Sequence, residues 1–201
     1  MPGGISPKRK GTRFERLIVN ILQEHMVVAK RVPLSGSTEF QKGDIVAKLA
    51  SGEDFVIEAK ARRDEFGLIY ALMETLKSNW LLISTADKPH PSIRSKKERE
   101  ELLKKGKQSP DVELLIGPFD DFVQKMTVVN DGYLEWIIVA GMTGFHKLAR
   151  KLYGWKGSAN AIVFKDDRRM PLIAIPKDEL VRVMEFGFMV VVDEEEGNNE
   201  E

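Results

Sequence analysis

Two carboxylates and a lysine are spaced along the sequence in a way that could do chemistry. Asp44 lies in "GDIVA", and Glu58 and Lys60 lie in "VIEAK", where polar and apolar residues alternate as in a strand. Side chains alternate between the two faces of a strand, so Val56, Glu58 and Lys60 share one face. Two carboxylates can bind a hard divalent cation such as Mg²⁺, and an ammonium can stabilise charge on a phosphate. This set of residues therefore suits metal-assisted phosphodiester hydrolysis.

The two segments are joined by the polar turn "ASGED", so a β-hairpin of residues 44–49 and 55–60 is expected. A hairpin centred on Gly52 pairs position 46 with position 58 and position 44 with position 60. Opposed residues lie on the same face, which predicts that Asp44, Glu58 and Lys60 converge. The pattern D…E-x-K is degenerate, however, and Glu58 and Lys60 could instead form the solvent face of an ordinary edge strand.

The composition limits the class of protein. The chain has 201 residues, of which 42% are hydrophobic and 31% charged, so one packed domain, or one domain with an insertion, is expected. It has no cysteine, which excludes disulfides and thiolate metal sites. No apolar run is long enough to span a bilayer and no signal peptide is visible. A cytoplasmic, intracellular protein without a membrane partner is therefore expected.

Charge is distributed unevenly, although the formal net charge is zero. Residues 193–201 hold six acids and no base, so the rest of the chain has 31 basic residues against 25 acidic ones. The body therefore carries a net charge of about +6 and is followed by an acidic tail that we expect to be disordered. Basic residues cluster in "KRKGTR", "ARR", "RSKKER" and "LLKKGK". Such clusters could neutralise DNA phosphates, with solvated surface as the alternative.

Periodicity along the chain predicts helices interleaved with strands, which indicates an α/β domain. Apolar residues fall at helical spacing over residues 12–24, whereas "NAIVF" and "PLIAI" are typical of strands separated by a polar turn. Helices are expected over residues 12–24, 65–78, 95–107, 119–128, 136–154 and 177–185, and strands over 26–32, 44–49, 55–60, 80–84, 111–117, 160–164, 171–175 and 188–193.

Several of these segments together resemble one family, the Holliday junction resolvases of archaeal and phage type, which are PD-(D/E)XK, restriction-endonuclease-like nucleases. The resemblance lies in "RKGTRFERLIVNIL", "VVAKRVPLSGS", "GDIVA" and "VIEAK". The segment "GLIYALME" resembles the family's next helix, and "NAIVFKDDRRMPLIAI" resembles the pair of strands that follows it in phage versions. The resemblance implies a restriction-endonuclease-like core with a central mixed β-sheet flanked by helices, here with a large, mostly helical insertion.

The resemblance also implies the roles of individual residues. Asp44 and Glu58 match the family's metal-binding carboxylates, Lys60 matches its catalytic lysine, and Glu15 matches a catalytic glutamate that completes the metal site. The implied cofactor is Mg²⁺, with Mn²⁺ as a substitute. Thr12 and Glu15 also have the spacing of a capping box, so Glu15 could simply cap its helix.

The remaining matches concern a serine-containing loop and the residues that bind DNA. Ser35 matches a loop serine linked to catalysis in archaeal members, with Ser37 on the same loop as the alternative. Turn chemistry is the simpler explanation for both serines. The basic N-terminal arm and the basic residues that flank the two predicted strands resemble DNA contacts, with plain surface charge as the alternative. The DNA-binding residues implied in this way are Lys8, Arg9, Lys10, Arg13, Arg31, Ser37, Arg62 and Arg63.

The sequence departs from simpler phage relatives, which pass almost directly from the helix "GLIYALME" to the strand "NAIVF". Here residues 78–158 intervene, beyond the usual length of a loop. We expect residues 1–77 and 159–192 to form the nuclease core, residues 78–158 an insertion of unknown role, and residues 193–201 the acidic tail. The insertion holds all three tryptophans, Trp80, Trp136 and Trp155, which we expect to serve core packing.

The resemblance implies a metal-dependent endodeoxyribonuclease that cuts branched DNA, foremost four-way junctions, and leaves 5′-phosphate and 3′-hydroxyl ends. Two strands of a junction are cut symmetrically, so a homodimer is expected. Two other functions stay open: a nuclease of the same core that acts on nicked, duplex or other branched DNA, and a non-catalytic DNA-binding protein. A preference for junctions over linear duplex would distinguish a resolvase from the broader nuclease. Metal-independent binding without cleavage would indicate the non-catalytic binding protein. The origin of the chain, host or phage, stays open as well.

Overall fold

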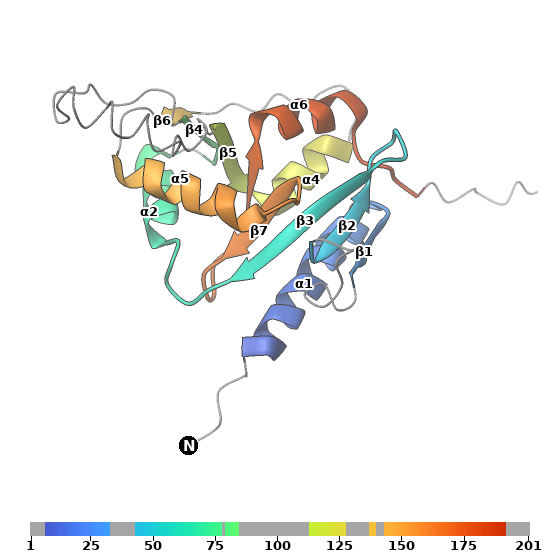
Figure 1. Cartoon of the computed structure of the whole chain (residues 1–201), viewed down its shortest axis with the longest axis horizontal. Coiled ribbons are helices and arrows are strands. Elements are labelled where there is room, and N and C mark those ends of the chain that lie inside the picture. The colour runs from blue at the N-terminus through green and yellow to red at the C-terminus, as the bar shows by residue number, and fades with distance from the viewer. Residues whose placement is uncertain are drawn as a thin grey trace, which may run out of the picture.

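A computed structural model describes residues 7–32, 43–77, 79–84, 113–127, 137–139 and 143–191 of the chain. Within these residues eight strands form one mixed sheet, in the order β1-β2-β3-β7-β8-β5-β4-β6 (Figure 1). The predicted α/β architecture, a mixed sheet flanked by helices, is confirmed. The elements in chain order are α1 (Pro7–Glu24), β1 (Ala29–Arg31), β2 (Ile45–Lys48), β3 (Asp54–Ala61), α2 (Gly67–Leu76), β4 (Leu81–Ser84), β5 (Glu113–Pro118), α4 (Phe119–Thr127), β6 (Ile137–Val139), α5 (Thr143–Lys156), β7 (Ala161–Lys165), β8 (Leu172–Pro176) and α6 (Lys177–Phe186).

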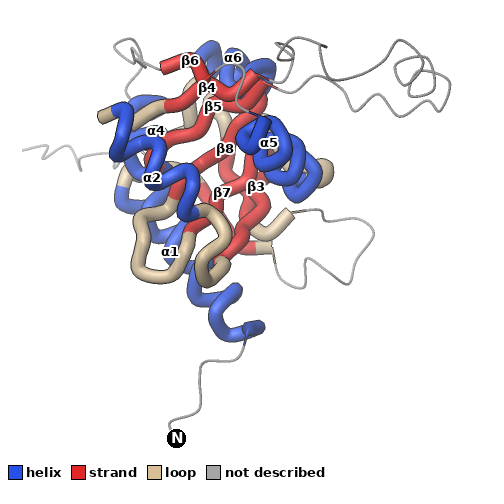
Figure 2. The backbone as a smooth tube through the Cα atoms, turned by 90° about the vertical axis from the view of Figure 1, so that its left-hand side faces the viewer, coloured by secondary structure: helices blue, strands red, loops and turns tan. Residues whose placement is uncertain are grey.

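The strands lie between helices, with an apolar cluster on each face of the sheet (Figure 2). One cluster joins the sheet to α1, α4 and α6, and the other joins it to α2 and α5. Successive residues of a strand point to opposite faces, so β7 supplies Val163 to the first cluster and Ile162 and Phe164 to the second. Ile57 of β3 belongs to the first cluster, which leaves Glu58 and Lys60 on the face that carries α2 and α5.

Strands β3 and β7 are parallel neighbours, with Ile57 opposite Ala161 and Lys60 opposite Phe164. About a hundred residues of sequence separate them, so the chain leaves the sheet after β3 and returns beside it. In the part of the chain that the structure describes, the intervening residues add β5, β4 and β6 to the sheet beyond β8. The division into a nuclease core and an insertion over 78–158 stays a prediction.

Three predicted elements differ from the structure. Helix α1 begins at Pro7, five residues before the predicted start. The first part of the predicted helix 136–154 is wrong, because Ile137–Val139 forms strand β6 beside β4; its three β-branched residues favour an extended chain. The predicted last strand over 188–193 is described up to residue 191. There the structure has only isolated bridges, between Val27 and Val190 and between Leu49 and Phe188. The predicted helix over 95–107 lies outside the described residues.

The structure describes two of the three tryptophans, Trp80 and Trp155. Trp80 is buried in the first cluster, and its indole N–H donates to a carboxylate oxygen of Asp121 at 2.9 Å. Trp155 is half-buried and packs edge-on against Phe66, with the ring centroids 5.9 Å apart. Trp136 lies outside the described residues. Among the described helices, none has both the length and the apolar composition needed to cross a membrane.

Candidate active site

The β2–β3 hairpin pairs in a register different from the predicted one. Ile45 lies opposite Ile57 and Val46 opposite Val56, whereas a hairpin centred on Gly52 would pair position 46 with position 58. The observed register moves each partner by two positions, so every side chain keeps its face of the sheet. Asp44, which directly precedes β2, therefore comes beside Glu58 rather than opposite Lys60.

The candidate site lies where the pairing of β2 with β3 ends. The N–H of Asp44 donates to the carbonyl of Ile57 at 2.9 Å, which is the last backbone bond of this ladder. The next N–H of β3 on this side, that of Ala59, donates to Oδ2 of Asp44 at 2.9 Å. A side-chain carboxylate thus takes the place of a strand carbonyl, and this bond fixes the carboxylate against β3.

Gly43 allows this close approach of Asp44 to β3. Its φ is 84°, a value that residues with a side chain rarely adopt. A Cβ atom built at position 43 would lie 2.3 Å from Cγ1 of Val56, well inside van der Waals contact. The sequence "GD" is therefore a structural pair, because the glycine lets the chain pass close enough for the aspartate to reach Ala59.

Glu58 and Lys60 contact each other on the face of β3 that carries α2 and α5. The ammonium of Lys60 donates to Oε1 of Glu58 at 2.5 Å. The two side chains are 20% and 27% exposed, so the pair is accessible yet largely shielded from water. This is the expected geometry of residues two apart on one strand, and it holds an ammonium next to the carboxylates.

Glu15 is in the middle of α1, about two turns after its first residue, Pro7. Because the helix begins at Pro7, Thr12 and Glu15 cannot form a capping box, and the capping interpretation is wrong. The Glu15 carboxylate instead accepts two hydrogen bonds from Arg31 of β1, from Nε at 3.0 Å and from Nη2 at 2.6 Å. Its side chain is 19% exposed.

The charges of Glu15 and Asp44 both act on Glu58. Burial raises the pKa of the Glu58 carboxyl above its ordinary value. The hydrogen bond from Lys60 lowers this pKa, and the negative charges of Asp44 and Glu15 raise it again. Glu58 therefore lies within electrostatic reach of Asp44, at the start of β2, and of Glu15, on α1.

The donor atoms at this place fit a hard divalent cation, because all three side chains offer carboxylate oxygens. Burial is the main cause of the raised pKa of Glu58, and a bound cation would relieve the repulsion from Asp44 and Glu15 that adds to it. In the residues that the structure describes, no three His, Cys, Asp or Glu side chains are already grouped as metal ligands. Instead, Lys60 and Arg31 act as counter-ions to Glu58 and Glu15, and a cation would share these carboxylates with them.

The residues predicted to contact DNA differ in their exposure and in the groups that they bind. Lys10 of α1 is bound to the carboxylate of Asp167 at 2.5 Å and to the carbonyl of Arg62 at 3.1 Å, so it ties the helix to the end of β3. The hydrogen bond from Lys10, together with its charge, lowers the pKa of Asp167. Arg63 is 89% exposed beside Asp64. Of the remaining predicted contacts, Arg9 and Arg13 are exposed on α1, whereas Ser35, Ser37 and the side chain of Lys8 lie outside the described residues.

Two residues that support β3 were not predicted from the sequence. Asn160 accepts a hydrogen bond from the N–H of Val56 at 2.7 Å and so holds the start of the strand. Asp166, which is buried, accepts from the N–H of Glu65 at 2.9 Å and from that of Phe66 at 3.0 Å, just after the strand. Both contacts join residues about a hundred positions apart, and the only sequence signal is a polar residue at each end of "AIVFK".

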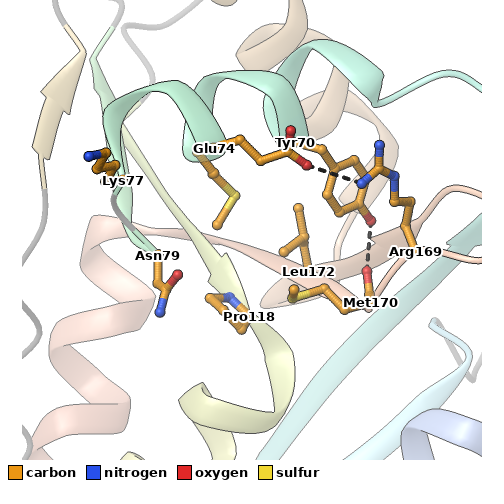
Figure 3. A pocket seen from close by; sticks show the side chains of 9 residues that line it. Tyr70, Glu74, Lys77, Asn79, Pro118, Arg169, Met170 and Leu172 are labelled. Carbon is orange, nitrogen blue, oxygen red and sulfur yellow. Dashed lines mark hydrogen bonds and ion pairs between the residues drawn. The ribbon is translucent and has the colours of Figure 1, made fainter.

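A cavity of about 290 Å³ lies beside α2 (Figure 3). Tyr70 and Glu74 of α2 line one side of it, and the Tyr70 hydroxyl donates to the carbonyl of Met170 at 2.7 Å. Arg169 closes it with an ion pair to Glu74 at 3.1 Å. None of Glu15, Asp44, Glu58 and Lys60 lines this cavity.

A mixed sheet with a carboxylate pair and a lysine on its hairpin, preceded by a glutamate-bearing helix, defines a restriction-endonuclease-like nuclease. Comparison with protein families agrees, since residues 6–106 match the archaeal Holliday junction resolvase (Hjc) family. The chain belongs to this family, whose members are nucleases that act on DNA junctions. The matched residues include all four side chains of the candidate site and end before α4. No solved structure matches the chain in a corresponding comparison.

Proposed function

We propose that this chain is a metal-dependent endonuclease that resolves four-way DNA junctions by paired phosphodiester hydrolysis. The proposal is supported by the hydrogen bond that fixes Asp44 against β3 and by the charges of Asp44 and Glu15, which both act on Glu58. A protein that only bound DNA would gain nothing from three acids at its binding surface, because they repel phosphates. The family supplies the substrate class, a DNA junction.

The charges of the site favour a divalent ion. Three carboxylates and the two cations Arg31 and Lys60 leave one net negative charge, which repels a phosphate. A divalent ion held by Glu15, Asp44 and Glu58 reverses that sign and makes the site attractive to DNA. When bound, such an ion polarises the phosphoryl oxygen and lowers the pKa of an attacking water. Mg²⁺ is the proposed ion, with Mn²⁺ as a substitute.

The chain's own residues position the reacting groups. The bond from Ala59 fixes the carboxylate of Asp44, and the two bonds from Arg31 orient that of Glu15. Lys60 holds its ammonium at the same place, where it can donate to a phosphate oxygen and offset the negative charge that grows in the transition state. Ser35, which follows β1 in the sequence, is proposed to steer the scissile phosphate.

The paired cuts of a resolution reaction need two active sites in one complex. One chain carries a single set of these residues, so we propose that a homodimer is the active form. Symmetric cleavage then follows from the two-fold symmetry of the dimer and of the junction. The mass of the protein in solution, measured by light scattering with and without junction DNA, tests this point.

The test of the proposed function compares a labelled synthetic four-way junction with a matched linear duplex, with Mg²⁺ and with chelator. We expect paired nicks in the junction alone, and we expect Asp44→Asn and Lys60→Gln to reduce cleavage by about 100-fold or more. The control is Asp54→Asn on the same strand, because Asp54 is exposed and pairs only with Lys48 among the residues described here. This variant should cleave like the wild type.

Three other outcomes would change the conclusion. Equal cleavage of junction and duplex would keep the site and indicate a broader nuclease. Junction binding without cleavage under any metal condition would indicate a non-catalytic binding protein. Cleavage that survives in the Asp44→Asn variant would refute the proposed site.

A further inference from the structure

Helix α5 has the composition of a surface that binds phosphates. Its fourteen residues include four lysines or arginines and no aspartate or glutamate. Charged helices of a soluble protein normally mix both signs, because opposite charges three or four residues apart stabilise the helix. The helix lies beyond residue 106, where the match to the resolvase family ends, so the family does not account for this bias.

One exposed stripe of α5 carries Arg150, Lys151 and Gly154. Arg150 and Lys151 are adjacent and lie four and three residues before Gly154, so both neighbour Gly154 on the helix surface. Arg150 makes no ion pair with any residue that the structure describes, and the side chain of Lys151 is 44% exposed. A Cβ atom at Gly154 would meet nothing within 4 Å among the described residues, so the packing does not require this glycine. Glycine lowers helix stability, but it leaves the backbone open to a close ligand.

The stripe adjoins the strand that carries the candidate site. Lys151 contacts the carboxylate of Glu65, and its ammonium lies 4.6 Å from the centre of the Trp155 ring. The guanidinium of Arg62 lies 5.2 Å from the centre of the same ring, and Arg62 directly follows β3. Glu65 also pairs with Arg62 at 3.3 Å. Arg62, Arg150 and Lys151 together exceed the single charge of Glu65, so this border is positive.

The stripe and the site lie on the same side of the sheet. Glu58 and Lys60 of β3 are opposite Ile162 and Phe164 of β7, and these apolar residues pack in the cluster that includes Leu152 of α5. Figure 1 shows α5 crossing in front of the sheet beside β7, next to β3. Helix α5 therefore borders the face of β3 that carries Glu58 and Lys60, where a scissile phosphate would lie.

We propose that the α5 stripe of Arg150, Lys151 and Gly154 binds the phosphate backbone of a DNA arm that leaves the active site across the end of β3. Arg150 and Lys151 neutralise phosphates, and Gly154 lets the DNA backbone approach the helix. Trp155 and Glu65 hold Lys151 and Arg62 in place. The inference rests on the proposed function, since it assigns a further contact for the same substrate.

The test measures the affinity of the full-length protein for a labelled four-way junction, with chelator so that no strand is cut, at several salt concentrations. Arg150→Gln should bind about 3–10-fold more weakly near 0.1 M salt and lower the slope of log K against log salt by about 0.9. The control is Lys177→Gln, which removes one exposed cation from α6 on the other side of the sheet. It should bind like the wild type.

A second variant separates binding from folding. Gly154→Gln raises the helix propensity of α5 but places a side chain where the DNA backbone would lie. We expect an equal or higher melting temperature together with weaker junction binding. Wild-type affinity in both Arg150→Gln and Gly154→Gln would overturn the proposal, as would a loss of binding that follows a loss of thermal stability in both.

The same measurements separate this proposal from the proposed function. A wild-type protein that binds the junction through α5 but never cleaves it with Mg²⁺ would refute the nuclease and leave the α5 contact standing. A wild-type protein that cleaves the junction, while the α5 variants bind it unchanged, would refute the α5 contact alone. A wild-type protein that binds neither junction nor duplex would overturn both.

Discussion

Two glycines of the catalytic hairpin allow a controlled test of how Asp44 is positioned. Gly43 and Gly52 have almost the same φ, 84° and 85°. An alanine at either position is forced into a backbone conformation that costs about 1–2 kcal/mol. The surroundings differ, because a Cβ at Gly52 meets nothing within 4 Å of the described residues, whereas a Cβ at Gly43 lies 2.3 Å from Cγ1 of Val56.

The expected difference follows from this contact. Gly52→Ala should lower the free energy of unfolding by the backbone cost alone, about 1–2 kcal/mol. Gly43→Ala should lower it by a further ~1–3 kcal/mol, because the chain or Val56 must move to relieve an overpacked contact. In a protein of this size, each kcal/mol corresponds to a change of about 2–4 °C in Tm. Movement of the chain at Gly43 also displaces Asp44, so junction cleavage should fall in Gly43→Ala and persist in Gly52→Ala.

Urea unfolding followed by tryptophan fluorescence gives both free energies. Repeating the pair in a Val56→Ala background removes Cγ1, so the gap between Gly43→Ala and Gly52→Ala should then close. Equal destabilisation by the two alanines in the wild-type background would refute this account of the site, and so would a gap that persists without Cγ1.

Two further predictions concern buried charge. Because burial and the neighbouring acids raise the pKa of Glu58, the folded chain holds that proton more tightly than the unfolded chain, and the ionised carboxylate costs stability above the ordinary value of 4.5. Glu58→Gln should therefore raise Tm at pH 7, with a gain that shrinks toward pH 4.5, while it abolishes cleavage; a lower Tm at pH 7 would contradict this reasoning. Asp166→Ala leaves the N–H groups of Glu65 and Phe66 without their buried acceptor and should cost about 2–4 kcal/mol in urea unfolding, with Asp166→Asn in between. Equal stability of the alanine variant and the wild type would show that water replaces the carboxylate.

The alternation of residues in "VIEAK" determined much of the local arrangement. Glu58 and Lys60 share a face in any register of the hairpin that keeps Ile57 inward, which is why the error of two positions in pairing did not change their side. Apolar spacing predicted the bounds of β3, β7, β8 and α6 to within one residue and the end of α1, because each element buries one regular stripe or face. The sequence also determined the basic bias of α5, which is a matter of composition.

Only the tertiary structure decided what Glu15 contacts. Its local spacing from Thr12 is that of a cap, but the helix begins five residues earlier and the carboxylate binds Arg31 on a strand. Likewise Asp166 binds Phe66 across about a hundred residues, and α5 comes to border β3 only because β7 pairs with that strand. Local patterns reflect energies between near neighbours in the chain, whereas these contacts depend on how separate elements pack, and the sequence pattern of each element alone carries no record of its partner.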